Sequence, residues 1–408
     1  MEMLCDPLEK LSLLSVHTRA MQIIEVKDKS TTEAFRQLPF RIYADDPNWI
    51  PHLRQDIEDI FDRKKNKFFR HGDAFRWILQ DDRGKTIGRI AAFVNDKLPH
   101  TRKREAGGVG FFECVDDLEA AKLLFDTAKQ WLRERGRKLM DGPINFGEKD
   151  RYWGLLTDGF DRPPHYAQNY HPPYYRALFE AYGFQVYYMQ FIFFRDITTP
   201  LQPKFQERYE RLKQDARYRC EHVSLGEMDR YAEDFRTVYN RAWSKHRDFS
   251  DMSSAQAKAL LRSIKPAIDE RLIWFVYFDD QPIGFYISLP ELNAIFRRIG
   301  DNLNAWRKLK FWIYKQLGVC EDSFGIAFGV DPDHQGKGVE GFMFQHMAEV
   351  IQKKKLYRGV VITWIGDFNP KMIAIIRSLG CEQIQELTTY RHLFDPNDHF
   401  ERYPLLDA

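Results

Sequence analysis

Apolar and polar positions alternate along the chain in a pattern that predicts short strands and amphipathic helices in a fixed order. In the first half, a helical region between residues 31 and 70 is interrupted by prolines, and a later helix from Leu118 to Leu132 repeats its apolar side chains at helical spacing. The turn at Asp81–Gly84 predicts a hairpin. The strands expected in this half are 22–26, 74–80, 86–94, 108–115, 138–142, 185–188 and 190–196, with a last helix at 173–182.

The second half repeats this order, which indicates an internal duplication. We expect an α/β fold of mixed sheet, with an extension at residues 1–20 and two similar domains at 21–197 and 198–408. The elements expected in the second half are strands at 219–224, 272–278, 282–289, 322–330, 359–364, 382–386 and 389–394, and helices at 227–243, 253–265, 338–353 and 369–379.

Two insertions break the repeat. Phe112 and Gly183 are 71 residues apart, whereas the matching Phe328 and Gly380 are 52 apart. The extra residues lie between 145 and 168, and a long irregular loop is more often a binding element than a passive connection. Within and just after this loop, the polar and aromatic residues suited to lining a substrate cleft are Asn145, Tyr152, Tyr170 and His171. The alternative is that these side chains only pack the loop against the sheet.

The second insertion, residues 291–318, is basic and apolar. Arginines and lysines alternate there with large apolar residues such as Trp306 and Trp312. Such a helical segment can lie on an anionic membrane or cover a long acyl chain, or it can be a lid helix packed on its own domain.

The sharpest local signal is the segment Val330–Val339, which lies between a predicted strand and a predicted helix. Gly336 and Gly338 allow a tight turn in which backbone amides converge at a helix N-terminus, and this arrangement suits a pyrophosphate. The glycines could instead only shape the turn. Residues 336–341 also fit GxGxxG, with Asp367 as a ribose-binding acid, but hairpins around the segment argue against a dinucleotide fold.

These residues resemble the acyl-CoA motif of the GNAT superfamily of N-acyltransferases, which has Gln or Arg, two residues, Gly, one residue, and Gly or Ala. The segment from Gln335 to Val339 matches all but the last place, where Glu340 departs from it. Asn369, Leu379 and Gly380 match a second motif. The order of elements extends the resemblance over residues 22–395, as in a tandem member of bacterial type.

The resemblance implies an acyl-CoA-dependent N-acyltransferase that uses acetyl-CoA or a longer acyl-CoA and transfers the acyl group by direct attack of an amine. It also implies that the CoA-binding residues are Phe328, Gly329, Val330, Gln335, Gly336, Lys337, Gly338, Val339 and Asn369. Many members have a tyrosine general acid where this chain has Ile376. Tyr390 and Glu321 are therefore candidate catalytic residues, and solvent, Asp322 or His334 remain alternatives.

The first half keeps the scaffold but has the acidic, glycine-free segment Glu113–Leu118 at the matching junction. This segment would repel phosphate, so we expect the first half to shape the acceptor site without binding CoA. The acceptor is expected to be a small-molecule or lipid-like amine. Two alternatives remain: a transferase of the Fem type that uses aminoacyl-tRNA, and a non-catalytic tandem that binds a ligand or partner.

Composition narrows the remaining function classes. Lys and Arg number 61 against 59 Asp and Glu, so no overall positive field favours nucleic acid. The five cysteines are widely spaced without a CxxC pair, which predicts neither a disulfide framework nor a metal site. No apolar run approaches the roughly 18 residues of a membrane span, and acidic residues interrupt the N-terminal apolar stretch. We therefore expect a cytoplasmic protein without a metal.

Overall fold

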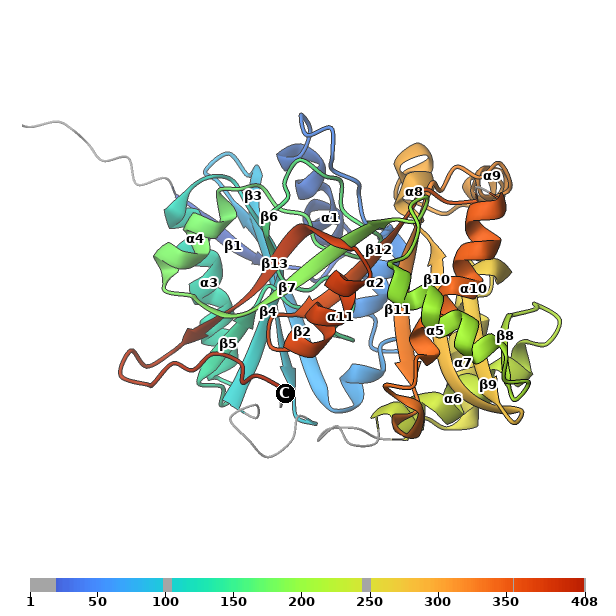
Figure 1. The fold of residues 1–408 in the computed structure, drawn as a ribbon. Coiled ribbons are helices and arrows are strands. Elements are labelled where there is room, and N and C mark those ends of the chain that lie inside the picture. Colours follow the sequence, from blue (N-terminus) through green and yellow to red (C-terminus); the bar gives the residue numbers. More distant parts are fainter. Residues whose placement is uncertain (1–19, 98–104, 244–250, 355, 407–408) are drawn as a thin grey trace, which may run out of the picture.

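The computed structural model describes residues 20–97, 105–243, 251–354 and 356–406. Across these residues the strands form one mixed sheet of 13 strands, and helices cover both of its faces (Figure 1). The expected extension at residues 1–20 lies outside the described residues, apart from its last position.

Two groups of five strands form the outer parts of the sheet, and they have matching topology. In each group the strands pair antiparallel, except for the fourth and fifth, which pair parallel. This match supports the internal duplication. The first group contains β1 (Gln22–Glu25), β2 (Gly72–Gln80), β3 (Thr86–Asn95), β4 (Ala106–Cys114) and β5 (Leu139–Gly142), and the second contains β8 (Tyr218–His222), β9 (Ile273–Phe278), β10 (Gln281–Pro290), β11 (Asp322–Val330) and β12 (Gly359–Gly366).

The centre of the sheet exchanges strands between the halves. β7 (Gln185–Asp196) pairs with β12 of the second group, and β13 (Glu382–Leu393) pairs with β5 of the first. β7 and β13 also pair with each other, and the short β6 (Leu155–Asp158) pairs with β13. Each half is therefore completed by the last strand of the other, and the sheet is continuous across the expected boundary at residue 197.

These central strands correct three expectations. The two strands predicted at 185–188 and 190–196 are the single strand β7, and those at 382–386 and 389–394 are the single strand β13. The segment 145–168, expected to be an irregular loop, contributes β6 to the sheet. Side-chain alternation identifies a strand, but it does not show where the strand is bent or which strand it pairs with. The boundary between the two domains stays a prediction.

The helices follow the predicted pattern, with one addition. The join between the halves forms a helix, α5, that the sequence analysis did not predict. The helices are α1 (Lys29–Ile42), α2 (Arg54–Phe61), α3 (Leu118–Arg133), α4 (Tyr175–Tyr182), α5 (Pro203–Lys213), α6 (Met228–Trp243), α7 (Ser254–Ile264), α8 (Asn293–Ile299), α9 (Ala305–Gln316), α10 (Val339–Lys354) and α11 (Pro370–Ser378).

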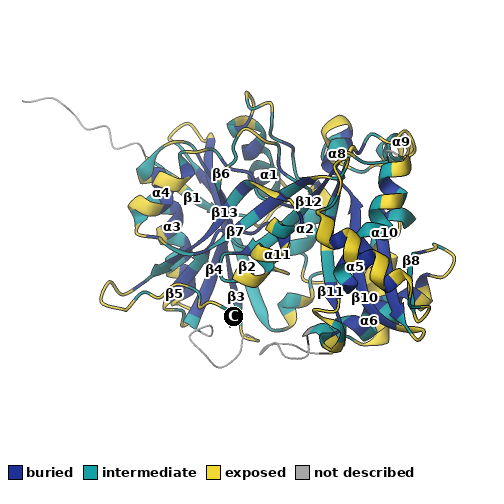
Figure 2. Ribbon diagram, viewed as in Figure 1, coloured by how far each residue is buried: buried dark blue, intermediate teal, exposed yellow. Residues whose placement is uncertain are grey.

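Apolar residues from the two sheet faces form separate cores. In the second half, side chains from α5, α10 and α11 pack on one face, and those from α6, α7 and α8 pack on the other. The central strands are buried, whereas exposed residues lie on the outward sides of the helices and on loops (Figure 2). This layering places β11 and β12 between two covered faces, and the features described below lie on both sides of these strands.

Candidate functional site

An apolar cavity of about 160 Å³ lies between α10, α11 and the strands β11 and β12. Ser323 and Gly325 line it from β11, Phe344 and Met347 from α10, and Ile376 from α11. Most of the lining is aliphatic or aromatic, and the few polar side chains include Arg195 and Gln352 at the end near the start of α5. Such a lining suits an apolar group far better than a polar one.

The strands that bound this cavity diverge along their length. β11 pairs with β12 only from Asp322 to Gly325, whereas its pairing with β10 continues to Val330. A bulge at Ile326 interrupts the register with β10 at the point where β12 leaves. Beyond Gly325, the edge of β11 that faces β12 is therefore open to hydrogen bonding by a ligand.

Phe328, Gly329 and Val330, the expected cofactor-binding residues of this strand, lie on that open part of β11. Phe328 lines the cavity, and its ring stacks on Phe344 with centroids 5.4 Å apart. Val330 belongs to the core beside α10. An extended ligand on this edge would contact the apolar cavity directly.

The glycine segment forms a tight loop after β11. Gly336 and Gly338 have φ angles of +75° and +95°, which L side chains rarely adopt, and α10 begins at Val339. Lys337 is exposed, while Gln335 donates from Nε2 to the Val330 carbonyl at 3.1 Å. The first amides of an α-helix have no acceptor within the helix, and those of residues 336–339 lie at the start of α10. These amides remain available to an anion.

The helix α5 adds positive charge to this loop. Arg211 donates from Nη2 to the Lys337 carbonyl at 2.7 Å. A Cβ atom on Gly338 would lie 3.2 Å from the Cβ of Arg208 and from Nη2 of Arg211. The loop is therefore closely packed on one side, and Arg208, Arg211 and Lys337 together favour an anionic ligand. The sequence analysis missed both arginines because the join was not predicted to be a helix.

Asn369 has a structural role in this structure. Its side chain accepts the Met372 amide at 3.1 Å and so caps α11, the helix that forms one wall of the cavity. Its expected part in cofactor binding stays a prediction.

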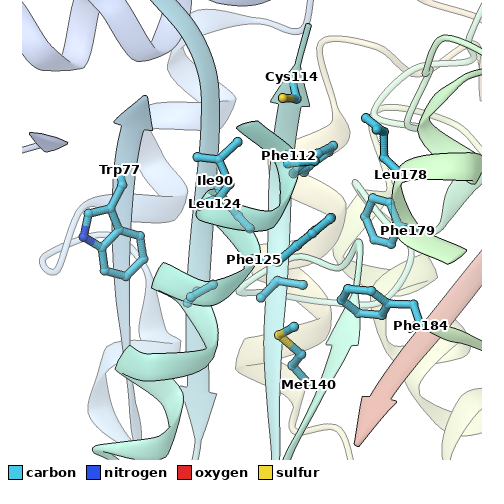
Figure 3. Packing of buried hydrophobic residues seen from close by; sticks show 14 of the residues in the cluster. Trp77, Ile90, Phe112, Cys114, Leu124, Phe125, Met140, Leu178, Phe179 and Phe184 are labelled. Carbon is cyan, nitrogen blue, oxygen red and sulfur yellow. The ribbon is translucent and has the colours of Figure 1, made fainter. Parts of the chain in front are cut away.

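The matching region of the first half is filled by aromatic side chains. Phe112 of β4 stacks on Phe125 of α3 with centroids 4.7 Å apart, and Phe179 and Phe184 pack against Phe125 (Figure 3). This half has a similar bulge in β4, where Phe111 has a φ angle of +51°. The two halves therefore share a backbone plan, but the β11–β12 half has a cavity where the first half is packed with aromatic rings.

Tyr390 and Glu321, the expected catalytic residues, do not meet at the open edge of β11. Tyr390 is buried in the aromatic core of the first half, and its hydroxyl donates to Glu180 of α4 at 3.1 Å. This position follows from the strand exchange, which takes β13 into the other half. Glu321 is exposed just before β11 and lines a separate hollow with Gly318 and Arg358. We do not assign a catalytic role to either residue.

The four expected substrate-binding residues are all buried. Tyr170 donates its hydroxyl to Asp46 at 2.7 Å, and His171 accepts the Leu156 amide at 3.2 Å. These hydrogen bonds connect the loop to the rest of the fold, and a part for either residue in substrate binding stays a prediction. Tyr152 lies near the junction between the halves, in a cluster with Ala167. The Oδ1 atom of Asn145 is buried and has no hydrogen-bond partner.

A buried polar pair lies at this junction. His165 from the first insertion faces Glu291 at the start of the second, with Nδ1 3.4 Å from Oε2. The other Glu291 oxygen accepts the amides of Tyr166 and Asn293, both at 3.0 Å. His165 Nε2 and Glu291 Oε2 are buried without a hydrogen-bond partner, which marks atoms available to a ligand or to water.

The polar pair and the cavity lie on opposite faces of β11. The ring of His165 is 6.3 Å from that of Phe324, whereas the neighbouring residues Ser323 and Gly325 line the cavity. Because successive side chains of a strand point to opposite faces, the backbone of β11 at residues 323–325, where it still pairs with β12, separates the two features by one layer. Tyr166 also donates its hydroxyl to Asp56 at 2.7 Å, and burial raises the pKa of this carboxyl group.

The sequence analysis did not single out His165 or Glu291. The available signal was their position, because each lies in or next to an insertion that breaks the internal repeat. The apolar cavity was also missed. Its lining alternates with core residues on α10 and α11, and no periodicity separates a side chain that fills a core from one that borders a cavity.

The chain is similar to known proteins over most of its length. It is 28% identical over 366 residues to a bacterial ceramide synthase of Caulobacter vibrioides, covering 88% of this chain and 94% of that protein. It is 24% identical over 378 residues to the protein YghO of Escherichia coli, covering 89% and 93%. No protein-family model matches the chain.

A solved structure decides the fold. A tandem GNAT protein from the clavulanic acid biosynthesis pathway covers 93% of this chain and 100% of its own, with a TM-score of 0.53 and 13% identity. The chain has a tandem GNAT fold. The expected fold class is thereby confirmed. In this tandem GNAT fold, the cavity and the glycine loop belong to the second repeat, and the His165–Glu291 pair joins the two.

No helix among the described residues is long and apolar enough to cross a membrane. The same part of the chain contains no group of three or more His, Cys, Asp or Glu side chains that could hold a metal ion.

Proposed function

We propose that the protein is an acyl-CoA-dependent N-acyltransferase whose acceptor is a lipid-like amine. The observation that carries this proposal is the apolar cavity beside the open edge of β11. The glycine loop directly follows this strand. The amides of residues 336–339, with Lys337 and Arg208, would hold the pyrophosphate of CoA. The open β11 edge from Ile326 to Val330 would bond the amides of its pantetheine arm, and the cavity would receive apolar parts of the substrates.

The relatives support the choice of an acceptor. A ceramide is a long-chain amino alcohol that carries an acyl group on its nitrogen, and the Caulobacter vibrioides relative is named for making one. The acyl chain of such a product would also explain why so much of the cavity lining in this chain is aliphatic. The proposal leaves the length of the acyl group open, from acetyl to long-chain.

The reaction joins an amine nitrogen to the thioester carbonyl carbon. The carbon–nitrogen bond forms, the carbon–sulfur bond breaks, the amine loses a proton and the CoA thiolate gains one. We propose that the amine approaches from the face of His165 and Glu291, where His165 Nε2 accepts the amine proton and Glu291 keeps the imidazole oriented. Backbone amides near the bulge at Ile326 would polarise the carbonyl.

The first experiment is calorimetric titration with CoA, acetyl-CoA and a long-chain acyl-CoA, with NADH as a control. We expect the CoA species to bind and NADH not to bind. Lys337→Glu reverses an exposed charge at the loop and should weaken CoA binding at least about tenfold. Lys353→Glu makes the same change at the exposed C-terminal end of α10 and should leave binding unchanged.

Turnover is measured by mass spectrometry of the N-acyl product formed from a long-chain amino alcohol. CoA binding without product from any amine tested would favour the non-catalytic alternative. Failure of every CoA species to bind would overturn the proposal. Activity that depends on aminoacyl-tRNA and is lost on ribonuclease treatment would favour the Fem-type alternative instead.

A further inference from the structure

Helix α9 presents a second apolar face to solvent. Its inner face packs on the protein, with Phe311 stacked on Phe296 of α8 at a centroid distance of 5.8 Å. Its outer face exposes Trp306 to 62% and Trp312 to 59%, and the loop after it exposes Leu317 to 71%. Of the nine large apolar side chains that are exposed in the described residues, five are in α9 or follow it directly: Trp306, Leu309, Trp312, Ile313 and Leu317.

The spacing of these side chains makes one stripe. Trp306, Leu309, Ile313 and Leu317 follow each other by three or four residues, so they lie along one side of the helix, with Trp312 next to them. An apolar stripe of this length on a helix that already has a buried face is not needed for folding. An exposed apolar stripe of this kind indicates a surface that binds another apolar surface.

The charged side chains along α9 are all of one sign. Residues 302–320 contain Arg307, Lys308, Lys310 and Lys315 and no acidic residue. Lys315 is used inside the fold, where Nζ donates to the carbonyls of Pro266 and Ile268, both at 2.8 Å. Lys308 is exposed, and Nζ of Lys310 lies 5.5 Å from the centre of the Trp306 ring. Both cations therefore border the apolar stripe and are placed to contact anions.

We propose that α9 docks the protein on an anionic lipid surface. Tryptophan rings and flanking lysines are the groups that favour the boundary between lipid headgroups and acyl chains. A second copy of this chain fits the surface less well, because a symmetric contact through α9 would bring the same cations of the two copies together.

The position of α9 connects this surface with the cavity. A hollow beside the cavity is lined by Gly318, which follows the exposed Leu317, and by Ile197 and Gln352. Ile197 and Gln352 also line the apolar cavity. Docking through α9 thus sets the lipid surface beside a hollow that adjoins the cavity, so a chain leaving the lipid has a short path to it. Figure 1 shows α9 beside α8 at one end of the molecule.

The test is flotation of the full-length protein with vesicles of phosphatidylcholine alone and of phosphatidylcholine with an equimolar amount of phosphatidylglycerol. We expect binding to the anionic vesicles, weakened by salt. The double variant Trp306→Ser/Trp312→Ser should lose binding at least about tenfold, because association follows the apolar area that enters the lipid. Lys308→Glu/Lys310→Glu should lose about as much on anionic vesicles and little on neutral ones.

The control is Leu260→Ser, which removes an apolar side chain of α7 that is 43% exposed. It should bind vesicles like the unchanged protein, and circular dichroism should show that every variant is folded. Absence of binding to anionic vesicles, or equal binding by all variants, would overturn the proposal. A concentration-dependent dimer that the tryptophan variant abolishes would assign the surface to a second copy instead. Titration with CoA is independent of α9, so failure here is distinguishable from failure of the proposed activity.

Discussion

At the scale of single residues, the His165–Glu291 pair combines burial with unused hydrogen-bonding capacity. Two backbone amides donate to one oxygen of Glu291, while its other oxygen, Oε2, and Nε2 of His165 are buried without a hydrogen-bond partner. Burying a polar atom without a hydrogen-bond partner costs free energy. Such atoms are therefore candidates for hydrogen bonding to a ligand.

His165→Gln keeps a polar side chain of similar length but cannot accept a proton at neutral pH. We expect kcat to fall about 10²-fold while the affinity for CoA stays unchanged, because the residue lies on the other face of β11 from the cavity. His399→Gln is the control, since that side chain is 79% exposed. An unchanged kcat in His165→Gln would remove the proposed role.

His171 ties the stability of the fold to pH. Burial lowers its pKa to about 3, so the folded protein keeps it neutral where the unfolded chain, with a pKa near 6.5, binds a proton. The unfolded state therefore gains protons as the pH falls below about 6.5, and stability decreases down to about pH 3, by up to about 1.4 kcal/mol per pH unit.

His171→Asn should reduce this dependence, because the asparagine oxygen can still accept the Leu156 amide but does not titrate. Urea unfolding at pH 7 and pH 5 measures the difference, with the exposed His399→Asn as the matched control. If the loss of stability between the two pH values is the same in His171→Asn as in the unchanged protein, buried His171 is not its source.

At the scale of elements, α10 and α11 form the walls of the cavity, and the small side chain of Ala348 on α10 keeps part of it open. Ala348→Phe should fill this space. We expect the affinity for a long-chain acyl-CoA to fall about tenfold or more and that for CoA itself to change little, because the loop at 336–339 is untouched. Calorimetric titration of both ligands measures the ratio. Equal losses for the two ligands would mean that the cavity does not receive the acyl chain.

The helices and strands also show which parts of the structure could be predicted from the sequence. The periodicity placed β11, the glycine loop and α10 almost to the residue, since each depends on local preferences such as the glycines at positive φ. The periodicity did not show which strands pair with β13, because apolar and polar side chains alternate along a strand in the same way whichever strands lie beside it. Tyr390 was consequently expected near the thioester, although β13 carries it to Glu180 in the other half.

At the scale of the whole molecule, the strand exchange joins the two repeats into one unit. β7 and β13 pair with each other and with the outer strands of opposite halves, so neither half can complete its sheet without the other. The two repeats therefore differ more in their buried side chains than in their backbone topology. The first repeat fills with phenylalanines the position at which the second keeps a cavity.

This exchange predicts that the protein unfolds as one unit. Scanning calorimetry should give a single transition with equal calorimetric and van't Hoff enthalpies, because loss of either half exposes the central strands of both. A chain ending at residue 381 lacks β13 and leaves β5 and β7 with open edges, so we expect neither half to fold. A chain ending at residue 395 keeps β13 and should retain the single transition at a somewhat lower temperature. Two separable transitions in the full chain would show that each repeat is stable without its exchanged strand.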